Sequence, residues 1–226
     1  MSDSALPSPP RRDGARTRER ILDAAERLFA ERGVAGVSLR AIIAEAGVNL
    51  AAVHYHFGSK DALVNAVVGR YAGPVNEQRL ARLDELERRY GRRPVPLRRL
   101  VAAFVDPVFE RAAEGDRGRD FVRLMGRLLA EPEYFFSRIA PEQFQVVRDR
   151  FLAAFRRALP RLTAAEVFWR LMLMVGALAA ALRMGEFGPE LSGGRVPPAT
   201  PEQTRRRLLD FLAAGLRARA SKEVKR

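Results

Sequence analysis

Cysteine is absent from this sequence of 226 residues, and histidine occurs only twice, as His54 and His56. Without cysteine the chain forms no disulfide, no thiolate zinc site, no iron–sulfur cluster and no cysteine nucleophile. Two histidines are too few for a three-histidine metal site. Residues two apart on a helix also point about 200° away from each other, so the pair does not chelate one ion. The sequence therefore predicts no metal, no cofactor and no catalytic residues.

An enzyme that works with paired carboxylates is the remaining catalytic alternative. The chain offers two candidate pairs, Glu131 with Glu133 and Asp116 with Asp120. General acid and base catalysis needs a positioned partner for the reacting group. Neither pair has a partnering base, so we expect a protein that is not an enzyme.

Long apolar runs are also missing. The longest one, Leu171–Leu182, has twelve residues and lies between Arg170 and Arg183, whereas a helix that spans a bilayer needs about 20. The first fifteen residues are rich in proline and serine and lack the apolar segment of a signal peptide. These features predict a cytoplasmic protein that does not act on a membrane.

Basic residues are in excess, because 40 Lys and Arg face 27 Asp and Glu, which gives a net charge of +13. This excess favours a polyanionic partner, either nucleic acid or an anionic membrane surface. The first 70 residues hold little of it, with ten basic against eight acidic residues. A peripheral membrane protein is therefore the alternative function, with a basic C-terminal tail made of Arg217, Arg219, Lys222, Lys225 and Arg226.

Strand patterns are missing as well, since no run alternates with period two between hairpin signals. Apolar residues instead recur with the helical period, which predicts an all-α fold. Residues 1–15, with three prolines and Gly14, are expected to form a disordered basic arm. A head at 16–70 and a larger helical body at 71–226 follow. Gly73-Pro74 is expected to punctuate the helical pattern after the helix that begins at Lys60.

Two short helices joined by a tight turn stand out in the head. Ser38 offers an N-cap oxygen to a helix that ends at Gly47, and Asn49 caps the next helix, Leu50–Phe57. This arrangement is typical of a helix-turn-helix, whose second helix enters the major groove of DNA. The second helix carries small residues for close approach and polar rings for base edges, namely Ala51, Ala52, His54, Tyr55 and His56. A plain helical hairpin is the alternative.

The stretch ILDAAERLFAERGVAGVSLRAIIAEAGVNLAAVHYHFGSKDALVNAV closely resembles the N-terminal domain of TetR-family transcriptional regulators. The resemblance implies a dimeric all-α repressor, in which a three-helix head binds a palindromic operator and a larger body dimerises and binds an effector. Many members have Tyr where this chain has His54. The resemblance assigns the contacts to double-stranded DNA to Ser38, Arg40, Asn49, Ala52, His54, Tyr55, His56 and Lys60.

Lys60 matches the phosphate-binding lysine of that family. It is one of only three lysines in a sequence that otherwise uses arginine. A compact ammonium at the start of a helix meets a phosphate as a point charge. A solvated surface lysine is the alternative.

The body is rich in aromatic side chains and methionine. Nine of the thirteen phenylalanines lie between Phe104 and Phe168, and Phe and Met line adaptable pockets as well as cores. The segments FVRLMGRLLAEPE and FWRLMLMVGALAAAL resemble, more weakly, a TetR-family branch that responds to long-chain fatty acids or acyl-CoA. The candidate effector contacts, with the arginines at an anionic head group, are Phe121, Arg123, Met125, Arg127, Phe168, Trp169, Arg170 and Met172. Core packing and surface arginines are the alternatives.

The last two predicted helices favour a dimer interface. Thr163–Arg183 presents small residues at Gly176, Ala177, Ala180 and Ala181, which allow helices to approach closely. Thr204–Leu216 adds four leucines at helical spacing. Packed against their symmetry mates, these helices would form a four-helix interface. Packing within one chain is the alternative.

Overall fold

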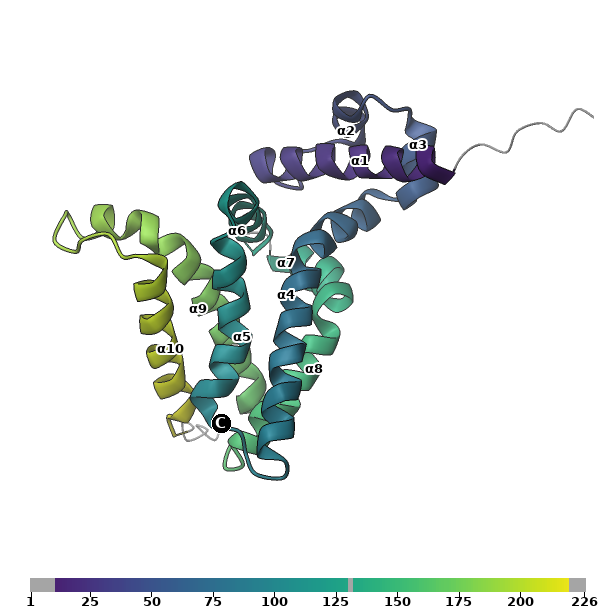
Figure 1. Cartoon of the computed structure of the whole chain (residues 1–226). Coiled ribbons are helices and arrows are strands. Elements are labelled where there is room, and N and C mark those ends of the chain that lie inside the picture. Colours follow the sequence, from purple (N-terminus) through teal and green to yellow (C-terminus); the bar gives the residue numbers. More distant parts are fainter. Residues whose placement is uncertain (1–10, 130–131, 220–226) are drawn as a thin grey trace, which may run out of the picture. The chain divides into compact units, whose positions relative to one another are not determined.

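The computed structural model describes residues 11–129 and 132–219. All regular secondary structure in these ranges is helical, which confirms the predicted all-α fold. The chain divides into two compact units, and the division falls after Arg70, inside a long helix. The helices, labelled in Figure 1, are α1 (Arg11–Arg32), α2 (Leu39–Ala46), α3 (Leu50–Phe57), α4 (Lys60–Tyr90), α5 (Leu97–Ala112), α6 (Gly115–Leu129), α7 (Pro132–Tyr134), the π-helix η1 (Phe135–Ile139), α8 (Ala140–Ala158), α9 (Ala164–Leu191) and α10 (Pro201–Arg217).

The first unit is built on α1, α2 and α3, each of which packs against the other two. Their shared core is apolar: Ile21, Phe29, Ile42 and Val53 are all buried. Arg70, in α4, adds ion pairs to α1 through Asp23 at 2.7 Å, Glu26 at 3.1 Å and Glu19. This unit therefore holds the two short helices in a fixed arrangement.

Helix α1 begins at Arg11, so the prediction of a disordered arm is wrong for residues 11–15. Pro10 is the last of the three prolines among residues 1–15, and a proline just before a helix removes no hydrogen bond from it. Gly14 costs a helix interior only about 1 kcal/mol, and Asp13 in the first turn interacts favourably with the helix dipole. Residues 1–10 of the predicted arm lie outside the described residues.

Helix α4 continues through Gly73 and Pro74 to Tyr90, so the expected interruption does not occur. A proline inside a helix removes one hydrogen bond and costs about 3 kcal/mol. Near Pro74, the side chains of Tyr71, Ala72 and Val75 are all buried. Burial of these side chains offsets the cost, because tertiary packing overrides local propensity.

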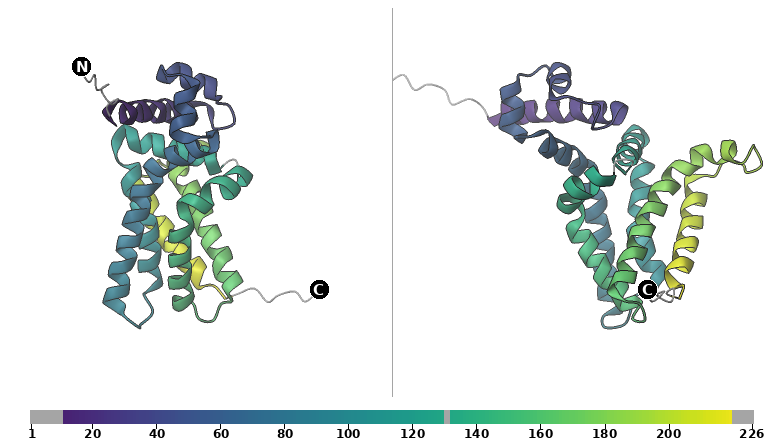
Figure 2. Two further views of the ribbon diagram at one scale, coloured as in Figure 1. Left: turned by 90° about the vertical axis from the view of Figure 1, so that its right-hand side faces the viewer. Right: turned by 180° about the vertical axis from the view of Figure 1, so that it is seen from behind.

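In the second unit, α5 packs against α6, α8, α9 and α10, and α9 packs against α6, α8 and α10. Figure 2 shows α9 and α10 side by side, in green and yellow. The centre is filled by fully buried side chains such as Phe151, Phe155 and Leu100, and the Phe104 ring meets Phe151 edge to face at 5.1 Å. This core positions the helices that surround the cavity described below.

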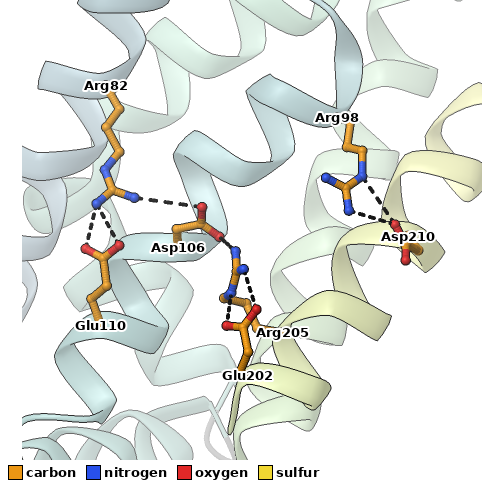
Figure 3. Close-up of polar contacts among 7 residues, drawn as sticks. All are labelled: Arg82, Arg98, Asp106, Glu110, Glu202, Arg205 and Asp210. Atoms are coloured by element: carbon orange, nitrogen blue, oxygen red, sulfur yellow. Dashed lines mark hydrogen bonds and ion pairs between the residues drawn. The ribbon is translucent and has the colours of Figure 1, made fainter.

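Ion pairs connect the outer surfaces of α4, α5 and α10 (Figure 3). Arg82 pairs with Glu110 at 2.6 Å, and Arg205 pairs with Asp106 at 2.8 Å. Arg98 reaches Asp210 at 2.9 Å. Exposed pairs of this kind contribute about 0–1 kcal/mol each, so they set the register of the helices more than they stabilise the fold.

One stretch of α9, Ala164–Leu182, is long and apolar enough to cross a bilayer by length and composition, and 28% of it is buried. Core helices of globular proteins pass the same test. Its exposed apolar side chains include Trp169 and Leu173, which are 63% and 70% exposed. In the basic tail, Arg217 and Arg219 are exposed, while Lys222, Lys225 and Arg226 lie outside the described residues.

Arg170 joins α9 to the end of α10. Its guanidinium pairs with Glu166 at 2.7 Å and donates to the carbonyls of Leu216 and Ala218, each at 2.7 Å. The last four carbonyls of a helix have no partner within the helix, so buried ones need an outside donor. Arg170, itself buried, supplies it.

Replacing Arg170 with methionine should therefore destabilise the second unit. We expect Arg170→Met to lower the free energy of unfolding by about 1.5–3 kcal/mol, because it removes charge-assisted hydrogen bonds from buried carbonyls. Urea unfolding followed by circular dichroism measures this change. The matched control is Arg123→Met on the surface of α6, which should stay within about 0.5 kcal/mol of the parent. Equal stabilities of the two variants would contradict the structural role of Arg170.

Candidate nucleic-acid interface and internal cavity

The turn between α2 and α3 is closed by two caps and one glycine. The Ser38 hydroxyl accepts from the Ala41 N–H at 3.2 Å, and the Asn49 side chain accepts from the Ala52 N–H at 2.8 Å. Gly47 adopts the left-handed conformation, with φ 61° and ψ 44°. These caps confirm the predicted ends of both helices, and they direct α3 away from α2 within three residues.

Arg20, on α1, braces this turn from behind. Its guanidinium donates to the carbonyls of Ala46 at 2.6 Å and Gly47 at 3.0 Å, which are the unpaired carbonyls at the end of α2. A Cβ at Gly47 would lie 2.9 Å from the same guanidinium nitrogen, which would have to shift, and the left-handed backbone is the main reason for glycine here. Sequence reasoning missed Arg20, because no local pattern connects it to a turn 26 residues away.

One face of α3 is exposed. It carries Leu50, Ala51, His54 and Tyr55, which share a side of the helix because they form two adjacent pairs four residues apart. Tyr55 is 85% exposed, while Val53 on the opposite side is buried. Ala52 and His56 are half-buried at the edge of this face. Sequence reasoning missed Leu50, although its spacing of four from His54 indicates the same face.

Two of the polar side chains predicted around this face, His54 and Lys60, have hydrogen-bond partners in the protein. His54 Nδ1 lies 3.0 Å from the Gly58 carbonyl oxygen. Lys60 donates to the Val34 carbonyl at 2.7 Å; an ammonium has three N–H groups, so two remain for a phosphate. Arg40 is exposed in the first turn of α2. The arrangement can therefore present rings to base edges and cations to a phosphate backbone.

The second unit contains a partly open cavity of about 330 Å³. Four of the predicted effector contacts line it, namely Phe121, Met125, Phe168 and Met172. The wall is almost entirely apolar, with further side chains from α4, α5, η1, α8 and α9 that include Val75, Phe104, Val108, Phe135, Phe136, Phe144, Leu171 and Leu178. A cavity of this lining and volume suits a small apolar ligand, since ligand sites commonly measure about 300–1,000 Å³.

The other four predicted contacts do not line the cavity, and this corrects the sequence-based assignment. Arg123 is exposed and lies 3.5 Å from Asp120, Arg127 is exposed, and Trp169 is 63% exposed on α9. Arg170 is engaged with the end of α10. Helical spacing places an arginine beside an apolar stripe, but it does not decide whether the long side chain turns inward or outward.

The cationic groups of the wall are instead Arg79 and Arg148. Arg79 is buried, and its Nε donates to the Phe104 carbonyl at 2.8 Å. Burial lowers the pKa of Arg79 to about 9, so the guanidinium stays protonated at neutral pH. Sequence reasoning missed Arg79. Its position, four residues after Val75 and four before Leu83, both buried, marks a charge on an apolar stripe.

One of the two acidic pairs considered for catalysis, Asp116 with Asp120, lies on the surface and is paired with arginine. Asp116 pairs with Arg119 and Asp120 with Arg123, both within one turn of α6. Glu131, of the other pair, lies outside the described residues. Within residues 11–129 and 132–219, no group of three or more His, Asp or Glu side chains could hold a metal ion.

Comparison with known proteins identifies the family. Residues 21–67 match the model "Bacterial regulatory proteins, tetR family", and residues 102–215 match "Tetracyclin repressor-like, C-terminal domain". The transcriptional repressor BepR of Brucella suis is 42% identical over 74 residues, which are 32% of this chain and 35% of BepR. The chain thus matches about a third or less of the length of its curated relatives.

Two solved structures extend the likeness to most of the chain. NalD, the secondary repressor of the MexAB-OprM multidrug efflux pump in Pseudomonas aeruginosa, is 24% identical with a TM-score of 0.61, over 91% of this chain and 98% of NalD. The fatty acid degradation regulator FadR of Bacillus halodurans is 14% identical with a TM-score of 0.59, over 95% of this chain and all of FadR. At these identities the likeness shows a shared fold.

The family model for the C-terminal domain alone spans half of the chain, and the N-terminal model spans the capped turn and the exposed face of α3. The members of this family and the relatives named above are transcriptional regulators and not enzymes. The chain therefore belongs to the TetR family of bacterial transcriptional regulators.

Proposed function

We propose that this protein is a cytoplasmic repressor that binds a palindromic operator as a homodimer and leaves it when an apolar ligand fills the cavity. The observation that carries the proposal is the exposed face of α3, held by capped helix ends, with Tyr55 85% exposed at its centre. Regulators of this family bind DNA and usually act as dimers with small-molecule effectors. The structure offers candidate residues for DNA binding, for dimerisation and for effector binding.

In the DNA complex, α3 lies in the major groove. Tyr55 and His54 contact base edges, and Ala52 allows the backbone to approach them. Ser38, Arg40, Asn49, His56 and Lys60 contact the sugar–phosphate backbone. The bond from Lys60 to the Val34 carbonyl holds the ammonium in place before DNA arrives.

The dimer forms through α9 and α10. Trp169, Leu173 and Phe211 are apolar and between 63% and 70% exposed, and Gly176 and Ala180 are exposed on the same side of α9. A second copy would cover this face in a symmetric four-helix contact. The apolar stretch of α9 then serves association and does not enter a bilayer.

The effector is an apolar molecule such as a long-chain fatty acid. The cavity of about 330 Å³ is near the small end of ligand sites, so only the acyl part of an acyl-CoA would have room inside. To act as an inducer, the ligand must bind the DNA-incompetent state more tightly than the DNA-bound state, since equal affinity would shift nothing.

Two variants of the head should weaken DNA binding in different ways. The test uses fluorescence anisotropy on an inverted repeat that the purified protein selects from genomic fragments. Lys60→Ala should weaken binding to every sequence and lower the salt dependence by about one counterion per protomer, because a phosphate contact is lost. Tyr55→Ala should mainly reduce discrimination, by about 1–3 kcal/mol, because a base contact is lost.

The exposed Arg123→Ala is the control and should bind as the parent does. Lys60→Ala with weaker binding but an unchanged salt dependence would show that Lys60 serves only the Val34 carbonyl. A Tyr55→Ala variant that discriminates as well as the parent would remove Tyr55 from base recognition.

Placing a charge on the exposed face of α9 should separate the dimer. We expect Leu173→Arg to raise the dimer dissociation constant by about 100-fold or more, because symmetry buries the unpaired charge twice. Sedimentation equilibrium measures the change. Val146→Arg, at an exposed apolar position on α8, is the matched control and should remain dimeric. A Leu173→Arg variant that stays dimeric would place the interface elsewhere.

A series of saturated fatty acids from octanoate to palmitate tests the effector. Each added CH₂ should contribute about 0.8 kcal/mol to binding until the cavity is full. Calorimetry gives the affinities, and anisotropy shows release of the operator at matching concentrations. Flat affinity along the series, or tight binding that leaves the DNA complex intact, would reject the acyl effector.

A further inference from the structure

Arg79 is a buried cation with neutral partners. It is 5% exposed, and within the part of the chain that the structure describes it forms no ion pair. Its Nε donates to the Phe104 carbonyl at 2.8 Å, and its Nη1 donates to the Asn76 side chain at 3.2 Å. The Phe104 ring covers one face of the guanidinium, with the ring centroid 3.9 Å from Cζ.

This environment differs from that of Arg170, the other buried arginine among the described residues. Arg170 has the carboxylate of Glu166 at 2.7 Å in addition to backbone carbonyls. A buried charge without a partner of opposite sign is costly, because the low dielectric of the interior does not replace the solvation that water provided. Arg79 therefore lacks a carboxylate partner that an anionic ligand could supply.

The Arg79 guanidinium is also held in position, and Arg79 forms part of the cavity wall. Asn76, which accepts from Nη1, donates in turn to the Gln143 carbonyl of α8 at 2.8 Å. The bond to Phe104 holds Arg79 to α5, so three helices define where the charge sits. No hydrogen bond uses Nη2 among the described residues, and the wall around Arg79 consists of apolar side chains such as Val75 and Val108.

Arg148, the second cation of the wall, is placed differently. Its side chain is 40% exposed, and its Nε pairs with Asp149 at 2.9 Å. A solvated and already paired arginine gains little from a ligand anion. The buried guanidinium gains more, because charge-assisted hydrogen bonds strengthen where water is excluded.

We propose that Arg79 anchors the carboxylate of an amphiphilic monoanion whose apolar part fills the rest of the cavity. The inference rests on the proposed function, since it takes the cavity to be the effector site, and it names the head group and the residue that binds it. A single buried cation suits one carboxylate and disfavours ligands with several charges. The site should also bind neutral molecules of the same length more weakly, because they leave the guanidinium unpaired.

The test compares dodecanoate with dodecanol, which differ only in the head group, by calorimetry on the full-length protein. The parent should bind dodecanoate at least about tenfold more tightly. Arg79→Met should lose this preference, with dodecanoate weakened by about tenfold or more and dodecanol little changed. Arg79→Gln keeps a hydrogen-bonding side chain without the charge and should behave as Arg79→Met does. Arg123→Met, which changes an exposed arginine, should keep the preference of the parent.

Thermal unfolding of each variant shows whether it is folded, and Arg79→Lys provides a second route if the neutral variants unfold. The lysine variant keeps the charge and should keep a preference for dodecanoate. Equal affinity of the parent for dodecanoate and dodecanol, with both releasing the operator, would overturn the role of Arg79 and leave the proposed function standing. Unchanged preference in a folded Arg79→Met would do the same. Failure of both compounds to bind would contradict the acyl effector and the anchor together.

Discussion

Backbone carbonyls that helices leave without a partner are the constraint on which this structure depends. An all-helical chain has several such ends, and buried ones need a donor from outside the helix. Arginine supplies it at two ends: Arg20 donates to the last carbonyls of α2, and Arg170 donates to those of α10. Arg79 also donates to a backbone carbonyl, that of Phe104 in α5. Part of the arginine excess thus holds the fold together.

These contacts also connect the fold to function. In the first unit, Arg20 and the two caps fix the direction of α3 and of the exposed face that carries Tyr55. In the second unit, Arg79 links α4 to α5 and brings a charge to an apolar cavity. Arg79 lies in α4, the helix that runs from Lys60 to Tyr90.

Local signals predicted the head well, and long side chains account for most of the errors. Ser38, Gly47 and Asn49 act through neighbours two to four residues away, so the sequence alone located both short helices. Phe121 and Met172 followed from apolar periodicity. Arg123 and Arg170 were expected at the cavity and do not line it. An arginine side chain reaches several ångströms in either direction, and tertiary packing decides its partner. For Arg79, the sequence signal is a charge within a stripe of apolar residues, and this signal does not indicate a ligand.

In the proposed complex, two copies of α3 read an inverted repeat from adjacent major grooves. Hydroxyl-radical footprinting of the selected operator, on both strands, tests this directly. We expect two protected segments related by a two-fold axis, with their centres about 34 Å apart or a multiple of that distance. One continuous protected segment without symmetry, or uniform protection of unrelated DNA, would contradict it.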